Sequence, residues 1–360
     1  MGTQPYKRVV AKDVADALGV SLCTVNKALS GKPGISDARR RQVQEKAREM
    51  GYKADSVAQV LARNPITIGI LSGYDKTELE ASYSRGILEG MDEEFAKLEK
   101  YKIKKSFHCT GDQINIDEVM KWIETDNIEA VCLCSTIAFS KGLPEMAERL
   151  AKRGVPLFVE GGTIENPDQF VSLVEVDADI SGRMAADLFY CMYGKDVRAA
   201  VLIGSLNVPN LRSKANGFIH TLENYGVDFR PTTGEFFRNP EKVREYVRNV
   251  IEREDINCIY DASSFHHIVC DELRRNGWQD RVAVIGTDYV KDATEQNFRD
   301  GILKAVIIQN ERRIGKRIVR IAYDYLINSR TFGMEDWTPP KQERIKPTFS
   351  TRSCFVHEKK

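Results

Sequence analysis

A short segment near the start of the chain carries side chains that could read DNA bases. Residues 22–29 have the sequence LCTVNKAL, which puts the apolar residues Val25, Ala28 and Leu29 on one side of a helix. The opposite side then exposes short, partly polar side chains: Leu22, Cys23, Asn26 and Lys27. Side chains of this size suit hydrogen bonding and apolar contact with base edges in the major groove.

The residues around this segment predict a helix-turn-helix. Val14 and Leu18 recur at helical spacing, and Gly19 can adopt the positive φ that ends a helix. Ser21 can then cap the second helix. A third helix is predicted over 36–50, which completes a three-helix head.

The charge distribution favours a nucleic-acid role for this head. Residues 1–64 contain twelve Lys or Arg and six Asp or Glu, so basic residues are in excess there. The whole chain is nearly balanced, with 53 Lys or Arg and 52 Asp or Glu. A basic head is attracted to phosphates, and a mildly acidic body stays away from the duplex. The alternative, a helical bundle without a nucleic-acid role, is disfavoured. Candidate phosphate contacts are Lys12, Arg39, Arg40, Arg41 and Lys46.

The first 60 residues resemble the lac repressor/Gal repressor (LacI/GalR) family of bacterial transcription regulators. The resemblance rests on short motifs at the family's spacing: KDVA at 12–15, GVS at 19–21, TV at 24–25, ALSG at 28–31, GIS at 34–36 and GY at 51–52. It implies base contacts by Leu22, Cys23 and Asn26, with Lys12, Ser21, Thr24 and Lys27 as further DNA contacts. Leu22 and Cys23 depart from the usual small or polar residues, so the operator should differ from the family consensus.

Residues 54–64 predict a short hinge helix between Asp55, a capping residue, and Pro65. Isolated helices of two turns are marginal in water, so this one needs a packing partner. The resemblance implies that it pairs with the same helix of a second copy in the minor groove, where Leu61 wedges between base pairs. The alternative is a linker in which Leu61 merely contacts the body.

The body predicts an α/β fold of doubly wound parallel sheets, because short β-branched apolar runs alternate with amphipathic stretches. Strands are expected at 66–71, 130–134, 155–159, 199–203, 257–260 and 282–285. The resemblance implies a two-lobed, periplasmic-binding-protein-like body. The expected organisation is a head at 1–53, a hinge at 54–64, a body at 65–330 and a tail at 331–360. Within the body, lobe 1 covers about 65–165 and 301–328, and lobe 2 covers about 170–290.

Polar residues at the ends of predicted strands and loops are candidates for ligand binding, because ligands of such folds lie beyond the carboxyl ends of the strands. Carboxylates accept hydrogen bonds from sugar hydroxyls, and amides both donate and accept. The resemblance implies effector contacts at Asp288 and Gln309, although such an Asp can also cap a turn. Further candidates are Ser135, Glu160, Lys214, Phe236 as a stacking wall, and Ser263.

At two places the sequence departs from the family pattern, so the chemical identity of the ligand is not fixed by the resemblance. Lys214 stands where the family usually has an Arg, and Lys cannot reproduce the two parallel hydrogen bonds of a guanidinium. The usual Asn-Pro-aromatic loop is replaced by residues 77–83. We expect a carbohydrate effector, with a purine, an amino compound or a phosphosugar as alternatives. Glu78, Glu80 and Glu160 would disfavour a phosphate if they face the ligand.

Catalytic, cofactor and metal sites are not predicted. The sequence has no Gly-x-Ser-x-Gly elbow, no phosphate loop and no Gly-x-Gly-x-x-Gly motif. Its eight cysteines are dispersed rather than arranged as metal ligands. Dispersed thiols, with no signal peptide and no long apolar run, indicate a cytoplasmic protein without a membrane contact.

These features together predict a homodimeric transcriptional regulator, most simply a repressor, that binds near-palindromic double-stranded operator DNA. Two half-sites require two heads, which is the reason for expecting a dimer. A small effector, expected to be a sugar, would change the operator affinity from the body. The alternative is a periplasmic-binding-like sugar-binding or catalytic α/β protein with a nonspecific basic head.

Overall fold

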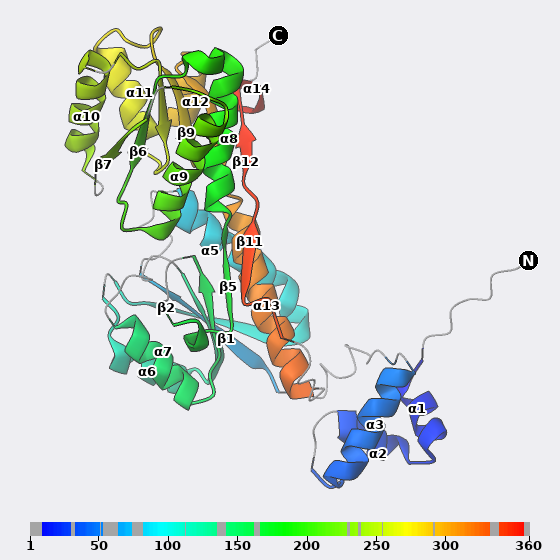
Figure 1. Ribbon diagram of the computed structural model, residues 1–360. Helices are drawn as coiled ribbons and strands as arrows, with labels where there is room; N and C mark the ends of the chain where they lie inside the picture. Colours follow the sequence, from blue (N-terminus) through cyan, green and yellow to red (C-terminus); the bar gives the residue numbers. More distant parts are fainter. Residues whose placement is uncertain are drawn as a thin grey trace, which may run out of the picture.

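The computed structural model shows a helical head and two sheets, each flanked by helices (Figure 1). It describes residues 9–29, 33–50, 52, 64–73, 82–111, 113–134, 142–161, 166–228, 231–236, 239–253, 255–290, 292–331 and 338–355. Among these residues, no helix is both long enough and apolar enough to cross a membrane.

The head is built from three helices: α1 (Ala11–Leu18), α2 (Leu22–Leu29) and α3 (Asp37–Glu49). Gly19 ends α1 with a φ of +62°, a conformation that costs glycine little. The backbone N–H of Thr24 donates to Ser21 Oγ at 3.1 Å, which caps the start of α2. Each helix contributes a fully buried residue to the core: Val14, Val25 and Val43. The predicted helix-turn-helix is confirmed.

The first sheet has six strands in the order β11-β5-β4-β3-β1-β2, and all neighbouring pairs are parallel. The strands are β1 (Ile66–Ser72), β2 (Ile103–Cys109), β3 (Ile128–Leu133), β4 (Leu157–Glu160), β5 (Ser172–Val176) and β11 (Gln342–Ile345). One face packs against α5 (Ser82–Leu98) and α13 (Glu311–Thr331). The other packs against α6 (Ile116–Thr125) and α7 (Leu143–Lys152).

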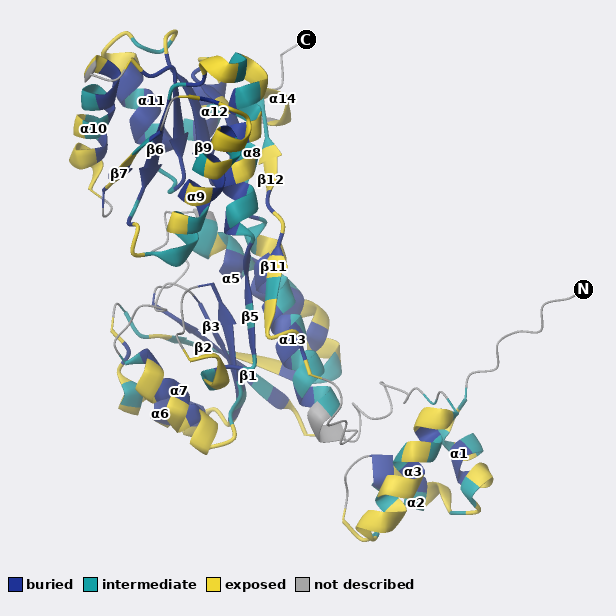
Figure 2. Ribbon diagram, in the orientation of Figure 1, coloured by how far each residue is buried: buried dark blue, intermediate teal, exposed yellow. Residues whose placement is uncertain are grey.

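The second sheet has the order β12-β10-β9-β8-β6-β7, in which β12 alone runs antiparallel to its neighbour. Its strands are β6 (Ala199–Ile203), β7 (Thr232–Glu235), β8 (Cys258–Asp261), β9 (Ala283–Thr287), β10 (Leu303–Ile308) and β12 (Thr348–Ser350). Its helices are α8 (Ala178–Tyr193), α9 (Pro209–Asn224), α10 (Pro240–Arg253), α11 (His266–Arg275), α12 (Ala293–Arg299) and α14 (Arg352–Phe355). Figure 2 shows that the central strands are buried between layers of helices, which explains their continuous apolar sequences.

The lobe boundaries differ from the expected ones. The strand expected in lobe 1 at 301–309 is β10, which pairs with β9 in the second sheet. A βαβ connection through α12 places β10 beside β9, so only α13 returns to the first lobe. Residues 172–176 were expected in lobe 2 without a predicted strand, but they form β5, which pairs with β4 in the first sheet.

The segment expected to be a tail instead contributes an edge strand to each sheet. β11 pairs with β5, and β12 pairs with β10. The chain therefore passes between the lobes three times: between β5 and α8, between β10 and α13, and between β11 and β12.

Candidate functional site

Helix α2, which was expected to read DNA bases, has an exposed face beside the buried core of the head. Leu22 is 45% exposed, and Cys23 and Asn26 are also exposed. Val25, on the opposite side, is fully buried. Because α2 is anchored by its apolar side, the exposed residues keep a fixed orientation toward a partner.

The other predicted DNA contacts lie around α2. Ser21 Oγ and Thr24 Oγ1 are 2.8 Å apart, so the two hydroxyls bond to each other at the start of the helix. Thr24 and Lys27 are half-buried, and Lys12 is exposed on α1. Leu61 and residues 54–63 of the expected hinge over 54–64 lie outside the described residues.

Arg40 supports α2 from the third helix. Its Nη1 donates to the carbonyl oxygens of Lys27 at 3.1 Å and Ala28 at 3.4 Å. These carbonyls belong to the last turn of α2, which leaves backbone acceptors without partners inside the helix. Arg40, expected as a phosphate contact, therefore has a structural task, whereas Arg39 and Arg41 are exposed.

Asp288 is the centre of a polar cluster at the carboxyl end of the second sheet. It follows β9 and is 3% exposed. Asp288 Oδ1 accepts a hydrogen bond from Gln309 Nε2 at 2.6 Å, and Oδ2 accepts one from Ser264 Oγ at 2.5 Å. Glu311, the first residue of α13, interacts electrostatically with Asp288. The structure thus brings the predicted residues Asp288 and Gln309 together.

Lys214 reaches this region because α8 and α9 cross closely. A Cβ on Gly182 of α8 would lie 1.9 Å from the carbonyl oxygen of Lys214, so only glycine allows this approach. Lys214 is 3% exposed, and its Nζ donates to the carbonyl oxygen of Ala262 at 3.2 Å. Its electrostatic neighbours are Asp288, Asp261 and Glu311.

The first lobe contributes Glu160 and Tyr83. Glu160 ends β4, is 1% exposed and accepts a hydrogen bond from the Tyr83 hydroxyl at 2.8 Å. Burial raises the pKa of Tyr83 well above its usual value, and Glu160, Asp288 and Glu311 raise it further. Since Asp288 belongs to the second lobe, a charged group of that lobe acts electrostatically on this first-lobe pair.

We call six of these residues the interlobe cluster: Tyr83, Glu160, Lys214, Asp288, Gln309 and Glu311. Burial, and then the nearby Asp288 carboxylate, raise the pKa of Glu311 to about 8. Burial lowers the pKa of Lys214, while Asp288 and other carboxyl groups oppose that shift. The cluster therefore contains hydrogen-bond donors and acceptors that match those of a polyol.

Three predicted effector residues are not in this cluster. Phe236 is 2% exposed and packs against Tyr246, with ring centroids 5.3 Å apart, in the hydrophobic core of the second lobe. Because it turns inward at the end of β7, we do not retain it as a stacking wall. Ser263 Oγ accepts a hydrogen bond from the N–H of Gly204 at 2.8 Å. Ser135 lies outside the described residues.

Two family models match this chain. The model described as "Bacterial regulatory proteins, lacI family" matches residues 11–55, which contain the three-helix head. The periplasmic binding protein domain matches residues 132–330, more than half of the chain. The chain joins a lacI-family head to a periplasmic binding protein domain.

Curated relatives of this chain are transcriptional regulators. HTH-type transcriptional regulator MalR of Staphylococcus xylosus is 21% identical over 72% of the chain and 75% of its own length. Catabolite control protein A of Priestia megaterium is 28% identical over 62% of the chain and 63% of its own length. HTH-type transcriptional regulator CelR of Thermobifida fusca is 22% identical over 90% of the chain and 94% of its own length.

Solved structures share the fold. The transcriptional regulator CelR–cellobiose complex aligns with a TM-score of 0.60 at 20% identity, covering 96% of this chain and 99% of that one. GanP, a glucose-galactose binding protein from Geobacillus stearothermophilus, aligns with a TM-score of 0.65 at 14% identity. The alignment covers 81% of this chain and 99% of GanP. The alignment with the CelR complex is long enough to include the head. The alignment with GanP shows that the two-lobed body has the same fold.

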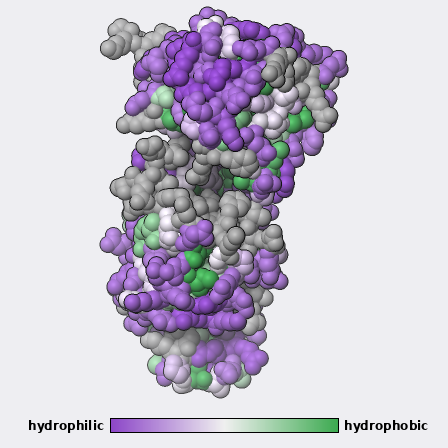
Figure 3. All heavy atoms as spheres, turned by 90° about the vertical axis from the view of Figure 1, so that its left-hand side faces the viewer, coloured by the Kyte–Doolittle hydropathy of each residue, from purple (hydrophilic) through white to green (hydrophobic). Residues whose placement is uncertain are grey.

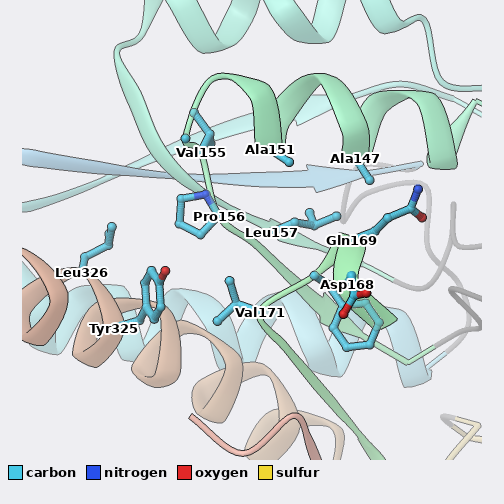
Figure 4. Close-up of a pocket in the computed structure, with 12 residues that line it drawn as sticks. Ala147, Ala151, Val155, Pro156, Leu157, Asp168, Gln169, Val171, Tyr325 and Leu326 are labelled. Atoms are coloured by element: carbon cyan, nitrogen blue, oxygen red, sulfur yellow. The ribbon is translucent and has the colours of Figure 1, made fainter. Parts of the chain in front are cut away.

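The first lobe of the body also has a hollow of about 290 Å³ (Figure 4). It is lined by α7, by Val155 and Pro156 before β4, and by Tyr325 and Leu326 of α13. The hollow lies at the amino end of β4, whereas Glu160 lies at its carboxyl end, so the two sites are separate. On the face in Figure 3, hydrophobic residues appear in small groups within a mainly hydrophilic surface.

Sequence reasoning missed three residues of this region. Ser264 has a φ of +69° and lies after β8, in a loop with no motif of its own. Tyr83 was predicted only as the start of a helix, and Glu311 immediately precedes the predicted helix over 312–327. Strand-end position could have indicated Glu311, which comes two residues after Gln309.

Proposed function

We propose that this lacI-family regulator is a repressor that binds a near-palindromic operator as a homodimer and responds to a small polyol bound by the interlobe cluster. One observation carries this proposal: a single chain joins a head whose second helix has an exposed face to two lobes, each with buried, hydrogen-bonded polar residues at its strand ends. Such a protein acts where the chromosome is, in the cytoplasm.

In this proposal α2 lies in the major groove. Leu22, Cys23 and Asn26 contact base edges, and Ser21, Thr24 and Lys27 contact the backbone or neighbouring bases from the ends and side of the helix. Lys12 neutralises a phosphate. Leu61 enters the minor groove at the centre of the operator, where an apolar wedge kinks DNA.

The effector would bind across the lobes. Asp288, Gln309 and Lys214 approach it from the second lobe, and Glu160 approaches it from the first. Ser263 and Ser135 are proposed as further contacts. CelR, a relative with the same fold, is described in complex with cellobiose, which supports a carbohydrate-like effector. A ligand that binds one arrangement of the lobes more tightly than another shifts their equilibrium, and with it the spacing of the two heads.

The test uses full-length protein and operator sequences selected in vitro from random duplexes. We expect one near-palindromic sequence to be enriched and bound at least about a thousandfold more tightly than random DNA, by fluorescence anisotropy. A carbohydrate that raises the melting temperature should also change operator affinity. Binding without sequence preference, unchanged by any carbohydrate, would support the alternative of a sugar-binding protein with a nonspecific basic head.

A further inference from the structure

Two buried ionisable side chains of the second lobe face each other. Asp261 ends β8, His266 begins α11, and both are 0% exposed. Asp261 Oδ2 lies 3.8 Å from His266 Nδ1, and neither atom has a hydrogen-bond partner among the described residues. A Cβ on Gly286 of β9 would lie 2.7 Å from His266 Cγ, so glycine makes room for the ring. Packing against the backbone of β9 thus holds the ring beside Asp261.

The other ring nitrogen of His266 leads to the chain after Asp288. His266 Nε2 and Thr294 Oγ1 of α12 are 3.0 Å apart. Thr294 Oγ1 also accepts a hydrogen bond from the N–H of Val290 at 2.8 Å, and the Thr294 N–H donates to the Val290 carbonyl oxygen at 2.8 Å. Val290 follows Asp288 by two residues. A path of contacts therefore runs from His266 through Thr294 to the segment 288–290.

Asp261 also holds the chain before Asp288. Its carbonyl oxygen accepts a hydrogen bond from Thr287 Oγ1 at 2.8 Å, and its Oδ1 accepts one from the N–H of Ser263 at 3.0 Å. Ser264, the next residue, donates to the Asp288 carboxylate. Three attachments thus lead to Asp288: from the residue before it, from the segment after it, and from the loop after β8.

The backbone conformation of Asp288 needs such support. Its φ is +65°, in the left-handed region that residues with a side chain uncommonly adopt. Conformations of this kind cost free energy and persist where the surrounding structure fixes them. Asp288 accepts hydrogen bonds from Gln309 and Ser264, so the same conformation determines where its carboxylate points. The attachments on both sides of Asp288 therefore set the geometry of the interlobe cluster at this residue.

The protonation states allow a continuous hydrogen-bonded relay. Burial lowers the pKa of His266 to about 3, so the ring is neutral at pH 7 and has one donor and one acceptor nitrogen. Burial raises the pKa of Asp261 to about 7, and above that pH its carboxylate only accepts hydrogen bonds. Nδ1, which faces this carboxylate, then carries the ring proton. Nε2 accepts from the Thr294 hydroxyl, which can at the same time accept from the N–H of Val290.

Building on the effector-binding function proposed above, we propose that His266 is a positioning residue for the effector: through Thr294 it fixes the segment 288–290, so that Asp288 is presented to the ligand in one orientation. His266 is completely buried and does not touch the ligand itself. Without the relay, the segment must be ordered when the ligand binds. Effector affinity then falls, because this ordering opposes binding.

The first measurement needs no ligand. Hydrogen exchange with mass spectrometry, on full-length protein at pH 8, follows peptides that contain the Val290 amide. Exchange should rise at least about threefold in His266→Leu and further in Thr294→Val, with no additional rise in the double variant, because one path is broken. Thr221→Val is the control, since it removes a hydroxyl that donates to the carbonyl oxygen of Gly217 in the same lobe. Unchanged exchange in His266→Leu would overturn the proposal.

The second measurement is effector affinity by calorimetry, with glucose, galactose, ribose and cellobiose as probes. A sugar that binds the wild type should bind His266→Leu and Thr294→Val at least about threefold more weakly. His266→Gln should retain the affinity, because its side-chain amide can still bond to the Thr294 hydroxyl. A lower melting temperature with unchanged affinity in His266→Leu would show a purely structural role and overturn the proposal. If no sugar binds the wild type, the polyol effector fails, while the exchange rates still decide whether His266 holds the segment.

Discussion

Asn26 and Lys12 are both exposed in the head, but they present different chemistry to DNA. An amide can pair with an adenine edge, whereas an ammonium neutralises a phosphate regardless of sequence. Asn26→Ala should therefore cost about 1–3 kcal/mol on the selected operator and relax the preference at one base position. Lys12→Ala should weaken binding to all sequences alike and reduce the slope of log K against log salt by about 1. Anisotropy on operator and random duplexes separates the two, and equal losses on both for Asn26→Ala would refute base reading.

Glu311 should make folding stability depend on pH. Burial and Asp288 raise its pKa from 4.5 to about 8, so the folded protein binds a proton that the unfolded chain releases. The stabilisation is complete below pH 4.5, falls as the pH rises and is lost above about pH 8. The charged groups facing Glu311 are Asp288 of the β9 end and Lys214 of α9, with the Tyr83 hydroxyl of α5 beside them.

Urea melts from pH 5 to pH 9 test this dependence. The free energy of unfolding of the wild type should fall more steeply over this range than that of Glu311→Gln. Asp261, whose pKa burial raises to about 7, titrates in the same direction in both proteins and cancels from the comparison. Parallel profiles would mean that Glu311 is ionised throughout the range.

At the scale of single residues, sequence located much of the interlobe cluster. Asp288 and Glu160 each follow a run of apolar residues, so their place at a strand end could be read directly. Phe236 could not be placed, because whether an aromatic ring lines a site or joins the core depends on partners such as Tyr246, distant in the sequence. Glu311 was missed because its proximity to Asp288 depends on the pairing of β9 with β10, which the sequence pattern does not show.

Among the elements, α2 depends on Arg40 for the end of its last turn. Arg40→Ala should destabilise the head by about 1.5–3 kcal/mol, since hydrogen bonds from a charged donor are lost. Operator affinity should fall with it, but the salt dependence should not change, because no phosphate contact is removed. The exposed neighbour Arg41 is the control: Arg41→Ala should leave the circular-dichroism melt unchanged. A flatter salt dependence with unchanged stability for Arg40→Ala would show that Arg40 contacts phosphate instead.

The elements that sequence predicted best are those with both faces buried. β6 was predicted over its observed residues, 199–203, because it lies in the middle of a sheet and is wholly apolar. The edge strand β2 contains Lys104 and Lys105 and was missed. β11 and β12 are short and polar, and they become strands only by pairing with β5 and β10, far away in the sequence. Local pattern cannot reveal such pairing.

Across the whole molecule, the three passages between the lobes are tied to one another. The N–H of Asp177, between β5 and α8, donates to the carbonyl of Ile345 at 2.9 Å. Asn310 Nδ2, between β10 and α13, donates to the carbonyl of Lys346 at 2.8 Å. Asn310 lies between the cluster residues Gln309 and Glu311, so a ligand that moves these two residues also acts on the passages.

Asn310 should therefore control how strongly the effector changes operator affinity. Asn310 has a φ of +60°, and Asn310→Gly accepts this conformation while removing the bond to Lys346. Effector affinity in calorimetry should stay within about twofold. The ratio of operator affinities with and without effector, typically about 5–150 in coupled systems, should fall toward one. Lys346→Ala is the control. Only the backbone carbonyl of Lys346 accepts the hydrogen bond from Asn310, so the ratio of operator affinities in this variant should match that of the wild type.

An unchanged ratio in Asn310→Gly would mean that the lobes communicate with the heads without the Asn310–Lys346 hydrogen bond, through the packing of α13 on α5.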